Sequence, residues 1–423
     1  MQKSTTHKVT HKKKNAKRTI TPNPLFVKFI RPIIHVILKH RYNLEIEDKV
    51  GLKDIKPPYI VVGNHVNYWD PFFLGSFLQQ DIQFIASDSV FRTRIFQILM
   101  KLLGSIPTSK FITDTTTVAQ IIRIVKRGGV IGVFPEGNST WDGCSLRHVP
   151  TVSRLIHKLK LPVIGVVVRG GYLSKPRWAR GLRRGKVFLE YKTVFTSEEL
   201  REIDGDTCRR LLEERIEHNE HEWNRAQGIR FVGKHQAEYI ERVLFVCPHC
   251  KAIGSFYSQG DTAECRECGY SFRYDEYGVL QNVNAPLVYT SIAEWNDWQI
   301  KYFIEYLSRD MNTSSPLFEE GPAILWRGYR SEPLKRLNTG RAYFYPYGIE
   351  FHTTVGKTKF FPIEEIFGEN VQNKEKLEFY HKNSLYRLDF INLRASAYMW
   401  YQAISLLHQK AHNIEIDGRA HVN

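Results

Sequence analysis

The sequence has few cysteines, no long apolar run and no acidic residue near its start. Six cysteines in 423 residues are too few for the disulfide framework typical of small secreted proteins. No stretch reaches the ~18 apolar residues that a transmembrane helix of ordinary length needs. The charged start is not followed by the continuous apolar core of a secretory signal. The sequence therefore predicts neither a secreted nor a membrane-spanning protein.

Acidic residues are missing from the first 44 positions, which carry eleven Lys or Arg before the first acid, Glu45. The whole chain has a net charge of +16. Residues 1–22 are polar and basic, so we expect a disordered tail. Such a tail is attracted to anionic surfaces, whether phospholipid or nucleic acid.

An amphipathic basic helix is predicted at 24–40, where apolar residues recur every three or four positions between Lys28, Arg31 and other cations. Pro32 predicts a kink in it. Two interpretations stay open. The helix either packs on the core of its own domain or lies in a bilayer interface with its basic side chains reaching phosphates.

The stretch PPYIVVGNHVNYWDP, 57–71, organises the first half of the chain. A short β-branched strand ends at Gly63 and is followed by His65 and Asp70. Five positions on a helix would set these two about 140° apart, so they can pair only if His65 lies on a loop and Asp70 begins the next helix. Asp70 and Pro71 suit the cap and first position of a helix. A carboxylate on one imidazole nitrogen would make His65 a general base, although a lone histidine is more often an ordinary one.

A second strand, Val130 to Phe134, ends in a Pro-Glu-Gly turn that places Glu136 at its carboxyl end, the edge where α/β sheets bind ligands. Strands and helices alternate from 57 to 195, which predicts a layered α/β domain. The predicted strands are 59–63, 82–86, 130–134, 163–168 and 186–192, and the predicted helices are 71–79, 91–103, 115–127 and 150–160.

NHVNYWD and FPEGNST resemble the two signature motifs of the glycerolipid acyltransferases, the lysophosphatidic acid acyltransferase superfamily. GSIPTSK at 104–110 and LPVIGVVV at 161–168 are similar to two further blocks of that family, and the resemblance covers roughly 25–225. It implies an O-acyltransferase that moves a fatty acyl group from acyl-CoA or acyl-carrier protein to a hydroxyl of a lysophospholipid or related glycerolipid. His65 would be the base, oriented by Asp70, and the transfer would be a single step with no serine or cysteine nucleophile.

The resemblance also implies the substrate-binding residues. It places Glu136 and Gly137 at the glycerol of the acceptor and Lys110, in the position of a family arginine, at its phosphate. The same motifs contain three more candidates, Asn64, Asn138 and Ser139.

Ser139 departs from the family pattern, which has arginine there. Lys110 keeps a charge but offers only a point contact, and Ser139 removes the second charge. Two acceptors stay open: lysophosphatidic acid, if Arg147, Arg169 or another cation takes over, or a less charged lysophosphodiester or glycolipid. The basic segment 169–186, with seven cations and no acid, would form a rim facing the membrane or the phosphates of CoA, or bind single-stranded nucleic acid.

Two Cys-x-x-Cys pairs, CPHC at 247–250 and CREC at 265–268, have fourteen residues between them. This spacing resembles a zinc ribbon, with Cys247, Cys250, Cys265 and Cys268 as the ligands of a structural zinc that has no open coordination position. Two disulfides are the alternative, which the lack of a secretory signal disfavours. Cys144 and Cys208 are ordinary side chains in this interpretation.

The last part of the chain predicts a helix over 291–309, then short strands from 322 onward and a closing helix over 394–409. This order resembles the pleckstrin-homology superfold, which would dock a lipid head group or a protein, or serve only for packing. The predicted fold class is an α/β acyltransferase domain followed by a small zinc ribbon and an α+β C-terminal module. The domains are 1–22 (tail), 23–228 (acyltransferase), 240–282 (ribbon) and 285–412 (helix and β-module).

Two functions therefore remain. The first is a peripheral membrane acyltransferase whose partners are an anionic membrane surface, a lysolipid and the carrier of the acyl donor, located in the cytoplasm on the inner face of the cell membrane. The second is a non-catalytic scaffold that binds membrane or nucleic acid through the tail, ribbon and β-module. The histidine, the carboxylate and the Glu-Gly turn favour the enzyme, and we do not expect nucleic acid as a partner.

Overall fold

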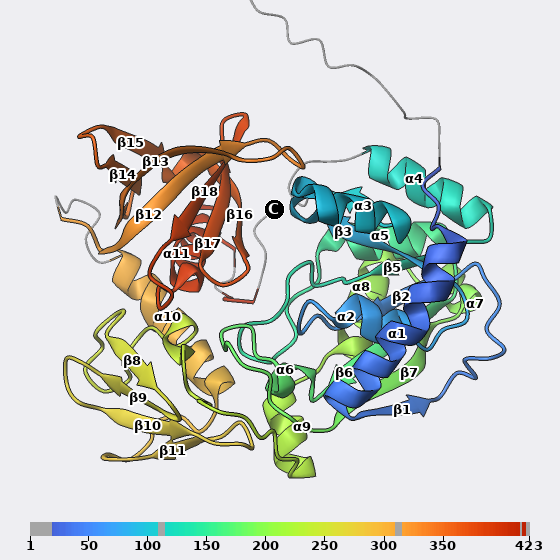
Figure 1. The fold of residues 1–423 in the computed structure, drawn as a ribbon, viewed down its shortest axis with the longest axis horizontal. Coiled ribbons are helices and arrows are strands. Elements are labelled where there is room, and N and C mark those ends of the chain that lie inside the picture. Colours follow the sequence, from blue (N-terminus) through green and yellow to red (C-terminus); the bar gives the residue numbers. More distant parts are fainter. Residues whose placement is uncertain (1–18, 109–114, 309–314, 415–416, 420–423) are drawn as a thin grey trace, which may run out of the picture.

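The structure is a computed structural model that describes residues 19–108, 115–308, 315–414 and 417–419. Figure 1 shows two lobes. One, the N-terminal domain, holds the elements from α1 to α9. The other holds a small four-stranded sheet with the cysteines, here the cysteine ribbon, and a larger antiparallel unit, here the β-module. The predicted basic tail lies almost wholly outside the described residues.

A seven-stranded sheet forms the centre of the N-terminal domain, in the order β1-β7-β6-β2-β5-β3-β4. β6, β2, β5, β3 and β4 run parallel, and β7 lies antiparallel to β6. The strands are β1 (Leu44–Asp48), β2 (Ile60–Gly63), β3 (Ile82–Ser87), β4 (Ile106–Thr108), β5 (Val130–Val133), β6 (Val163–Arg169) and β7 (Val187–Phe195). All five predicted strands are confirmed. β1 and β4 escaped prediction because β1 is a charged, mostly exposed edge and β4 has only three residues.

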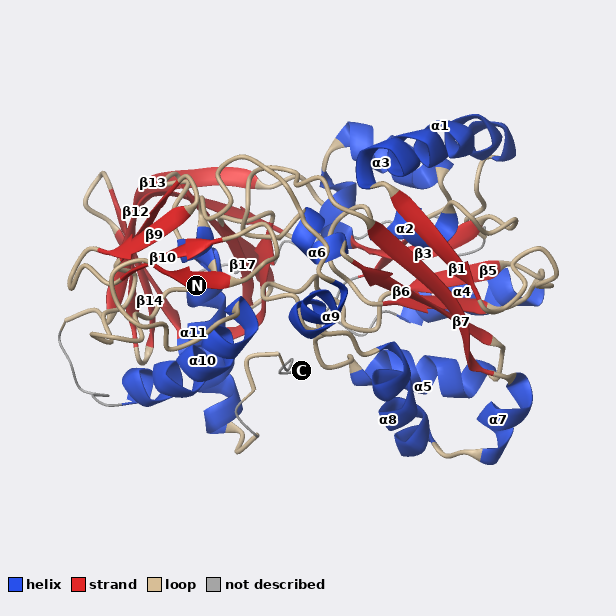
Figure 2. Cartoon of the chain, turned by 90° about the horizontal axis from the view of Figure 1, so that it is seen from below, coloured by secondary structure: helices blue, strands red, loops and turns tan. Residues whose placement is uncertain are grey.

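Helices cover both faces of this sheet (Figure 2). α1 and α2 pack on one face through Leu38, Tyr42 and Phe73, and α5 and α8 pack on the other through Ile156, Leu212 and Ile216. The helices are α1 (Pro24–Tyr42), α2 (Asp70–Gly75), α3 (Arg94–Leu102), α4 (Thr115–Lys126), α5 (Pro150–Leu159), α6 (Gly171–Ser174), α7 (Ser197–Glu202), α8 (Gly205–Ile216) and α9 (Glu220–Gln227), with a 3-10 turn, η1 (Asp88–Arg92), before α3.

The predicted helix at 24–40 is confirmed as α1, which continues through Pro32. The side chain of Asn23 accepts a hydrogen bond from the Phe26 N–H, and Pro24 occupies the first turn, where a missing N–H costs nothing. Within the described residues, no helix is long and apolar enough to cross a membrane.

The cysteine ribbon is an antiparallel sheet in the order β11-β10-β9-β8. Its strands are β8 (Phe256–Gln259), β9 (Thr262–Cys265), β10 (Ser271–Tyr274) and β11 (Leu280–Asn282), and a second 3-10 turn, η2 (Ile240–Arg242), precedes it. α10 (Ile292–Ser308) follows and joins the ribbon to the β-module. Trp295 on this helix is fully buried against the ribbon residues Phe256 and Phe272.

The β-module is an antiparallel sheet of seven strands in the order β15-β14-β13-β12-β18-β17-β16, closed by α11 (Ala397–Ala411). Its strands are β12 (Phe318–Gly328), β13 (Lys335–Tyr345), β14 (Gly348–Thr353), β15 (Thr358–Pro362), β16 (Ile366–Gln372), β17 (Lys376–His381) and β18 (Ser384–Phe390), with a 3-10 turn, η3 (Ile363–Glu365), before β16. The predicted C-terminal antiparallel strands are confirmed, and the likeness to the pleckstrin-homology superfold stays a prediction.

The two lobes are joined by buried ion pairs. Arg92 of η1 pairs with Glu378 of β17, and its Nε donates to the Arg330 carbonyl at 2.8 Å. Near the C-terminus, Arg419 pairs with the buried Asp142 at 3.1 Å. The β-module is therefore held against the N-terminal domain on the side where the central strands end.

Candidate active site

The candidate site lies where β2 and β5 end side by side. These strands are parallel neighbours in the middle of the sheet, so the residues that follow them meet at one edge. His65 comes two residues after β2, and Glu136 comes three residues after β5. The two signature motifs therefore meet at one edge of the sheet.

His65 and Asp70 form a close pair, with 2.6 Å between His65 Nδ1 and Asp70 Oδ2. His65 lies on the loop after β2, and Asp70 is the first residue of α2, as the sequence required. The imidazole stacks on the ring of Phe134, with 4.5 Å between the centroids. The side chain of His65 is 21% exposed, whereas that of Asp70 is fully buried. One face of the imidazole is thus fixed and part of the ring remains accessible.

The Asp70 carboxylate does not cap α2, contrary to the expected capping role. The residue before the helix is Trp69, and no side chain caps that end. Instead, Asp70 Oδ2 accepts the N–H groups of Val66 and Asn67 at 2.7 and 2.9 Å in addition to the imidazole. Burial raises the pKa of Asp70, and the hydrogen bond from His65 opposes this rise. The loop and the imidazole are therefore held by one carboxylate.

Glu136 is buried behind the His65 loop. Its Oε1 accepts the N–H of His65 and its Oε2 accepts the N–H of Leu146, both at 2.8 Å. Burial raises the pKa of Glu136 to about 8, and these two backbone donors oppose the rise. The side chain is 1% exposed. This geometry makes Glu136 a brace between two loops.

Asn64 and Gly137 also have structural reasons for their identity. The Asn64 side chain exchanges two hydrogen bonds with the backbone of Val168, which ties the end of β2 to β6. Gly137 has φ +69°, a backbone conformation that favours glycine, and an added Cβ would lie 3.0 Å from Val149. Gly137 lies on a cavity wall, whereas Asn64 is buried.

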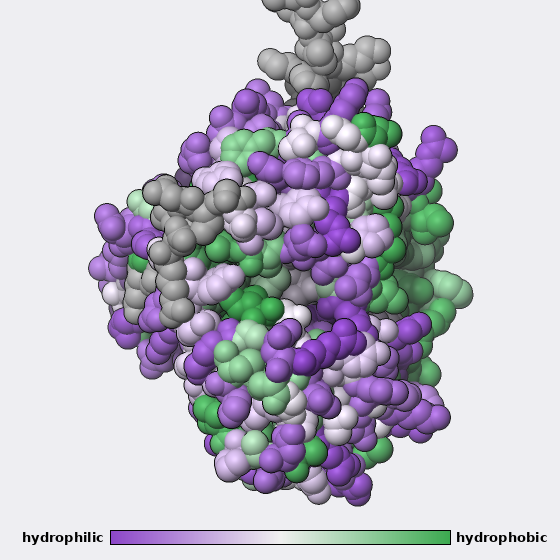
Figure 3. Space-filling model, turned by 90° about the vertical axis from the view of Figure 1, so that its left-hand side faces the viewer, coloured by the Kyte–Doolittle hydropathy of each residue, from purple (hydrophilic) through white to green (hydrophobic). Residues whose placement is uncertain are grey.

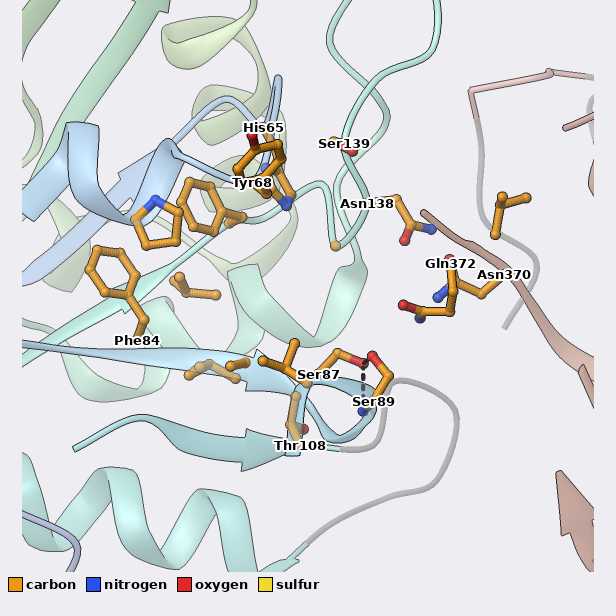
Figure 4. A pocket seen from close by; sticks show the side chains of 18 of the residues that line it. His65, Tyr68, Phe84, Ser87, Ser89, Thr108, Asn138, Ser139, Asn370 and Gln372 are labelled. Atoms are coloured by element: carbon orange, nitrogen blue, oxygen red, sulfur yellow. Dashed lines mark hydrogen bonds between the residues drawn. The ribbon is translucent and has the colours of Figure 1, made fainter. Parts of the chain in front are cut away.

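A cavity of about 2430 Å³ opens in front of His65 (Figure 4). It is larger than the ~300–1,000 Å³ of sites for drug-sized ligands. One end is apolar and is lined by side chains of α1, β3, α3 and α4, among them Ile30, Phe84, Phe96, Leu99 and Ile121. The other end is polar and includes Asn138, Ser139, Lys175 and Arg177. The cavity can hold a long apolar chain and a polar group at once.

The β-module supplies part of the polar wall, which the sequence did not predict. Asn370 and Gln372 of β16 lie opposite Asn138, whose side chain points toward them in Figure 4. Lys374, in the turn after β16, lines the same cavity. The signal was hidden because β16 contains Gly368, Glu369 and Asn370, residue types that strands disfavour, and its pairing with β17 is irregular there.

The cations near Ser139 differ from those considered in the sequence. Arg147 is engaged with Asp417 at 2.6 Å, and Arg169 pairs with Glu190. Arg177 instead lies against the Ser139 backbone, with its Nη1 donating to the Ser139 carbonyl at 2.8 Å. Its guanidinium stacks on Trp141, 4.4 Å from the ring centroid. Lys110 lies outside the described residues.

Another short histidine–carboxylate pair, with a fully buried carboxylate, lies away from the cavity. His218 Nε2 is 2.7 Å from Glu220 Oε2, and the side chains are 6% and 0% exposed. The backbone of His218 exchanges hydrogen bonds with Ser145, so this pair fastens α9 to the loop that follows β5. Neither side chain is among those that line the cavity in front of His65.

The four ribbon cysteines come together, as their spacing predicts. Their sulfur atoms all lie within 4.8 Å of one another. The Cys247–Cys268 and Cys250–Cys265 separations are 3.8 and 3.7 Å, too long for a disulfide bond of ~2.05 Å. Sulfurs bound to a tetrahedral zinc at ~2.3 Å would be about 3.8 Å apart, so the residues present fit a metal site. Cys144 and Cys208 are buried and distant from this cluster in the sequence.

Comparison with known proteins shows similarity to acyltransferases. Residues 17–169 match the family model described as Acyltransferase. The chain is 24% identical, over 194 residues, to the chloroplastic 1-acyl-sn-glycerol-3-phosphate acyltransferase of Brassica napus. It is 22% identical, over 156 residues, to the 1-acyl-sn-glycerol-3-phosphate acyltransferase of Bacillus subtilis.

These matches cover only part of each protein. The Brassica alignment spans 42% of this chain and 56% of that protein, and the Bacillus alignment spans 36% and 76%. A crystal structure of the 1-acyl-sn-glycerophosphate acyltransferase of Thermotoga maritima aligns with 44% of this chain and 80% of its own, at 24% identity and a TM-score of 0.36.

Proposed function

We propose that this protein, an O-acyltransferase by its acyltransferase-family domain at 17–169, moves a fatty acyl group from a thioester donor to a hydroxyl of a lysophospholipid or related glycerolipid. The observation that carries the proposal is the His65–Asp70 pair, which is half enclosed at the wall of a large two-ended cavity. Acyl-CoA and acyl-carrier protein are the donors we consider.

The pair supports a general-base role for His65. With Asp70 ionised, His65 Nδ1 donates to it, which leaves the lone pair on Nε2. Nε2 would take the proton of the acceptor hydroxyl while that oxygen attacks the thioester carbonyl. The C–S bond then breaks, and the departing thiolate takes the proton from the imidazolium. Asp70 stabilises the imidazolium between these steps.

The cavity supports the binding of two substrates. Its apolar end suits a fatty acyl chain, because burial of each methylene contributes ~0.8 kcal/mol. Its polar end would hold the head group of the acceptor, with Gly137, Asn138 and Ser139 on the wall. Asn64 would act by tying the end of β2 to β6, and Glu136 by holding the loops of His65 and Leu146 together, since both side chains are buried.

Incubation of the purified full chain with radiolabelled acyl-CoA or acyl-carrier protein and a panel of lysolipids tests the proposed activity. We expect labelled diacyl product from at least one donor and acceptor pair. Failure of every pair, with protein that is folded and binds vesicles, would favour the non-catalytic scaffold instead.

We also propose that the protein acts at the surface of an anionic membrane, on the cytoplasmic side. α1 and α3 lie side by side in Figures 1 and 2, and the Asn23 N–H donates to the Leu102 carbonyl between them. Both helices expose large apolar side chains, including Leu25, Phe29 and Val36 on α1 and Ile95, Phe96 and Ile98 on α3. In contrast, the face of the ribbon and β-module in Figure 3 is mostly hydrophilic where grey atoms do not cover it.

Sedimentation with vesicles tests this membrane surface. Phe29→Asp and Ile95→Asp should reduce binding to anionic vesicles, because each removes apolar burial and adds repulsion, and higher salt should weaken binding of the unaltered chain. Val355→Asp, at an exposed position of the β-module, is the matched control. Equal binding by all three variants, or equal binding to neutral vesicles, would contradict the proposal.

For the ribbon we propose a structural zinc held by Cys247, Cys250, Cys265 and Cys268. Four thiolates fill a tetrahedral zinc, so the metal would supply folding energy to the ribbon and no step of acyl transfer. Protein purified without chelator should contain about one zinc per chain. A metal content near zero would end this assignment.

A further inference from the structure

We propose that the polar end of the cavity binds a phosphate group of a substrate, through Lys175 and Arg177 of the N-terminal domain and Lys374 of the β-module. This inference rests on the proposed acyl transfer and names what the polar end recognises. Lys374 is about 200 positions from Lys175 and Arg177 in the sequence, yet all three residues line one cavity with His65.

The two lysines converge on one short stretch of backbone. Lys175, which follows α6, donates to the Arg180 carbonyl at 2.9 Å. Lys374, in the turn between β16 and β17, donates to the neighbouring Ala179 carbonyl. An ammonium has three donors, so each lysine keeps further N–H groups for a ligand. Two cations thus stand close together at the cavity wall.

Arg177 connects this cluster to the loop of the candidate active site. Its Nη1 donates to Ser139 and its Nη2 donates to the Val371 carbonyl of β16 at 2.6 Å. A guanidinium therefore lies against the backbone at the very position where Ser139 replaces an arginine side chain. Arg177 therefore supplies a positive charge near residue 139, where the side chain has none, and its hydrogen bond to Val371 of the β-module helps to hold it there.

Little acidic charge opposes this cluster in the described part of the chain. Among the described residues, no carboxylate forms an ion pair with Lys175, Arg177 or Lys374 within 4.0 Å, and Glu375 is the acid that acts on Lys374 from its own turn. Burial, with Arg242, Lys175 and Arg180 nearby, lowers the pKa of Lys374 to about 7. Burial also lowers the pKa values of Lys175 and Arg177.

A bound anion would offset the repulsion among these positively charged side chains. Phosphate accepts several charge-assisted hydrogen bonds at once and restores the protonated state of a depressed lysine. Two parts of the proposed substrates carry phosphate: the head group of a lysophospholipid and the nucleotide end of CoA. Both offer the same chemistry, so the experiment is designed to separate them.

Equilibrium titration of the full chain with sn-glycerol 3-phosphate and with adenosine 3′,5′-bisphosphate tests the site without turnover. We expect one probe to bind the unaltered chain, and glycerol 3-phosphate would identify the acceptor whereas the bisphosphate would identify CoA. Lys374→Met and Lys175→Met should each weaken that probe ~10-fold, as loss of a charge-assisted hydrogen bond does. Lys374→Arg should bind nearly as the unaltered chain does.

Lys382→Met is the matched control, because Lys382 is an exposed lysine in the next hairpin turn of the β-module, between β17 and β18, and does not line the cavity. It should leave binding unchanged. Equal affinity in all variants, or no binding of either probe to the unaltered chain, would overturn the site. Kinetics distinguish failure of the phosphate site from failure of the proposed acyl transfer. If Lys374→Met catalyses acyl transfer with an unchanged KM, the phosphate site is refuted and the activity stands. If a probe binds but no acyl transfer is detected, the activity is refuted and the phosphate site stands.

Discussion

Two short histidine–carboxylate pairs of the described residues, His65–Asp70 and His218–Glu220, both have a fully buried carboxylate, but only the first of these two faces the cavity. His65–Asp70 spans 2.6 Å and His218–Glu220 spans 2.7 Å. The first histidine is 21% exposed at the end of a central strand, and the second is 6% exposed between α9 and a loop. We refer to them as the open pair and the closed pair. The contrast teaches that close pairing alone does not make a site, because a base must also reach the substrate.

The largest expected difference between the two pairs is in turnover. His65→Ala should lower acyl transfer ~10²–10⁴-fold, the usual contribution of a general base, while the protein stays folded. His218→Ala should keep turnover within a few-fold but lower the free energy of unfolding by about 1–3 kcal/mol, because Glu220 loses its buried partner. Initial rates and thermal unfolding of both variants test this. Near-normal rates in His65→Ala would refute the base assignment.

Glu136 should affect the open pair without touching the substrate. Glu136→Ala leaves the N–H groups of His65 and Leu146 unpaired, so we expect kcat to fall ~10-fold and KM for the acceptor to stay unchanged. Leu146→Ala is the control, because it trims a side chain and keeps the backbone donor. A raised KM with normal kcat would instead place Glu136 at the glycerol of the acceptor, as the family resemblance implies.

Ser139 should influence substrate choice rather than rate. Ser139→Arg adds a second guanidinium beside Arg177, so use of lysophosphatidic acid should improve a few-fold relative to a lysophosphodiester, as ~1 kcal/mol of added attraction would give. Relative kcat/KM values for the two acceptors measure this. If the unaltered chain already prefers lysophosphatidic acid and the variant keeps that preference, the replacement carries no meaning for the substrate.

The smallest expected effect concerns the pH dependence of stability. The folded pKa of Lys374, about 7, lies below the unfolded value of ~10.4. The unfolded chain therefore binds more protons between these values, so the cost of burying the charge is full below pH 7 and fades as the pH rises. The Tm of Lys374→Met should therefore exceed that of the unaltered chain by about 2–4 °C at pH 6, the shift that a gain of ~1 kcal/mol in the free energy of unfolding would give, and by less at pH 9. The same gain in Tm at pH 6 and at pH 9 would contradict the lowered pKa of Lys374.

The open pair could be predicted from the sequence, and its surroundings could not. A strand that ends at Gly63 and a helix that begins at Asp70 are local features, so five-residue spacing sufficed to place the His65 imidazole beside its carboxylate. The polar wall is different, since Arg177 meets Val371 across 194 positions and β16 lacks the alternation of a strand. The closed pair was also missed, because two positions from His218 to Glu220 indicate no contact until the loop between them is known.

The most direct test of the account is the turnover of the double variant His65→Ala/Asp70→Asn compared with both single variants. Residues that act as one unit show non-additive losses. If Asp70 works only by orienting His65 and stabilising its cation, the double variant should be no slower than His65→Ala alone. Losses that multiply, so that the double variant is slower by the product of the two single effects, would contradict the central claim that the open pair acts as a single base.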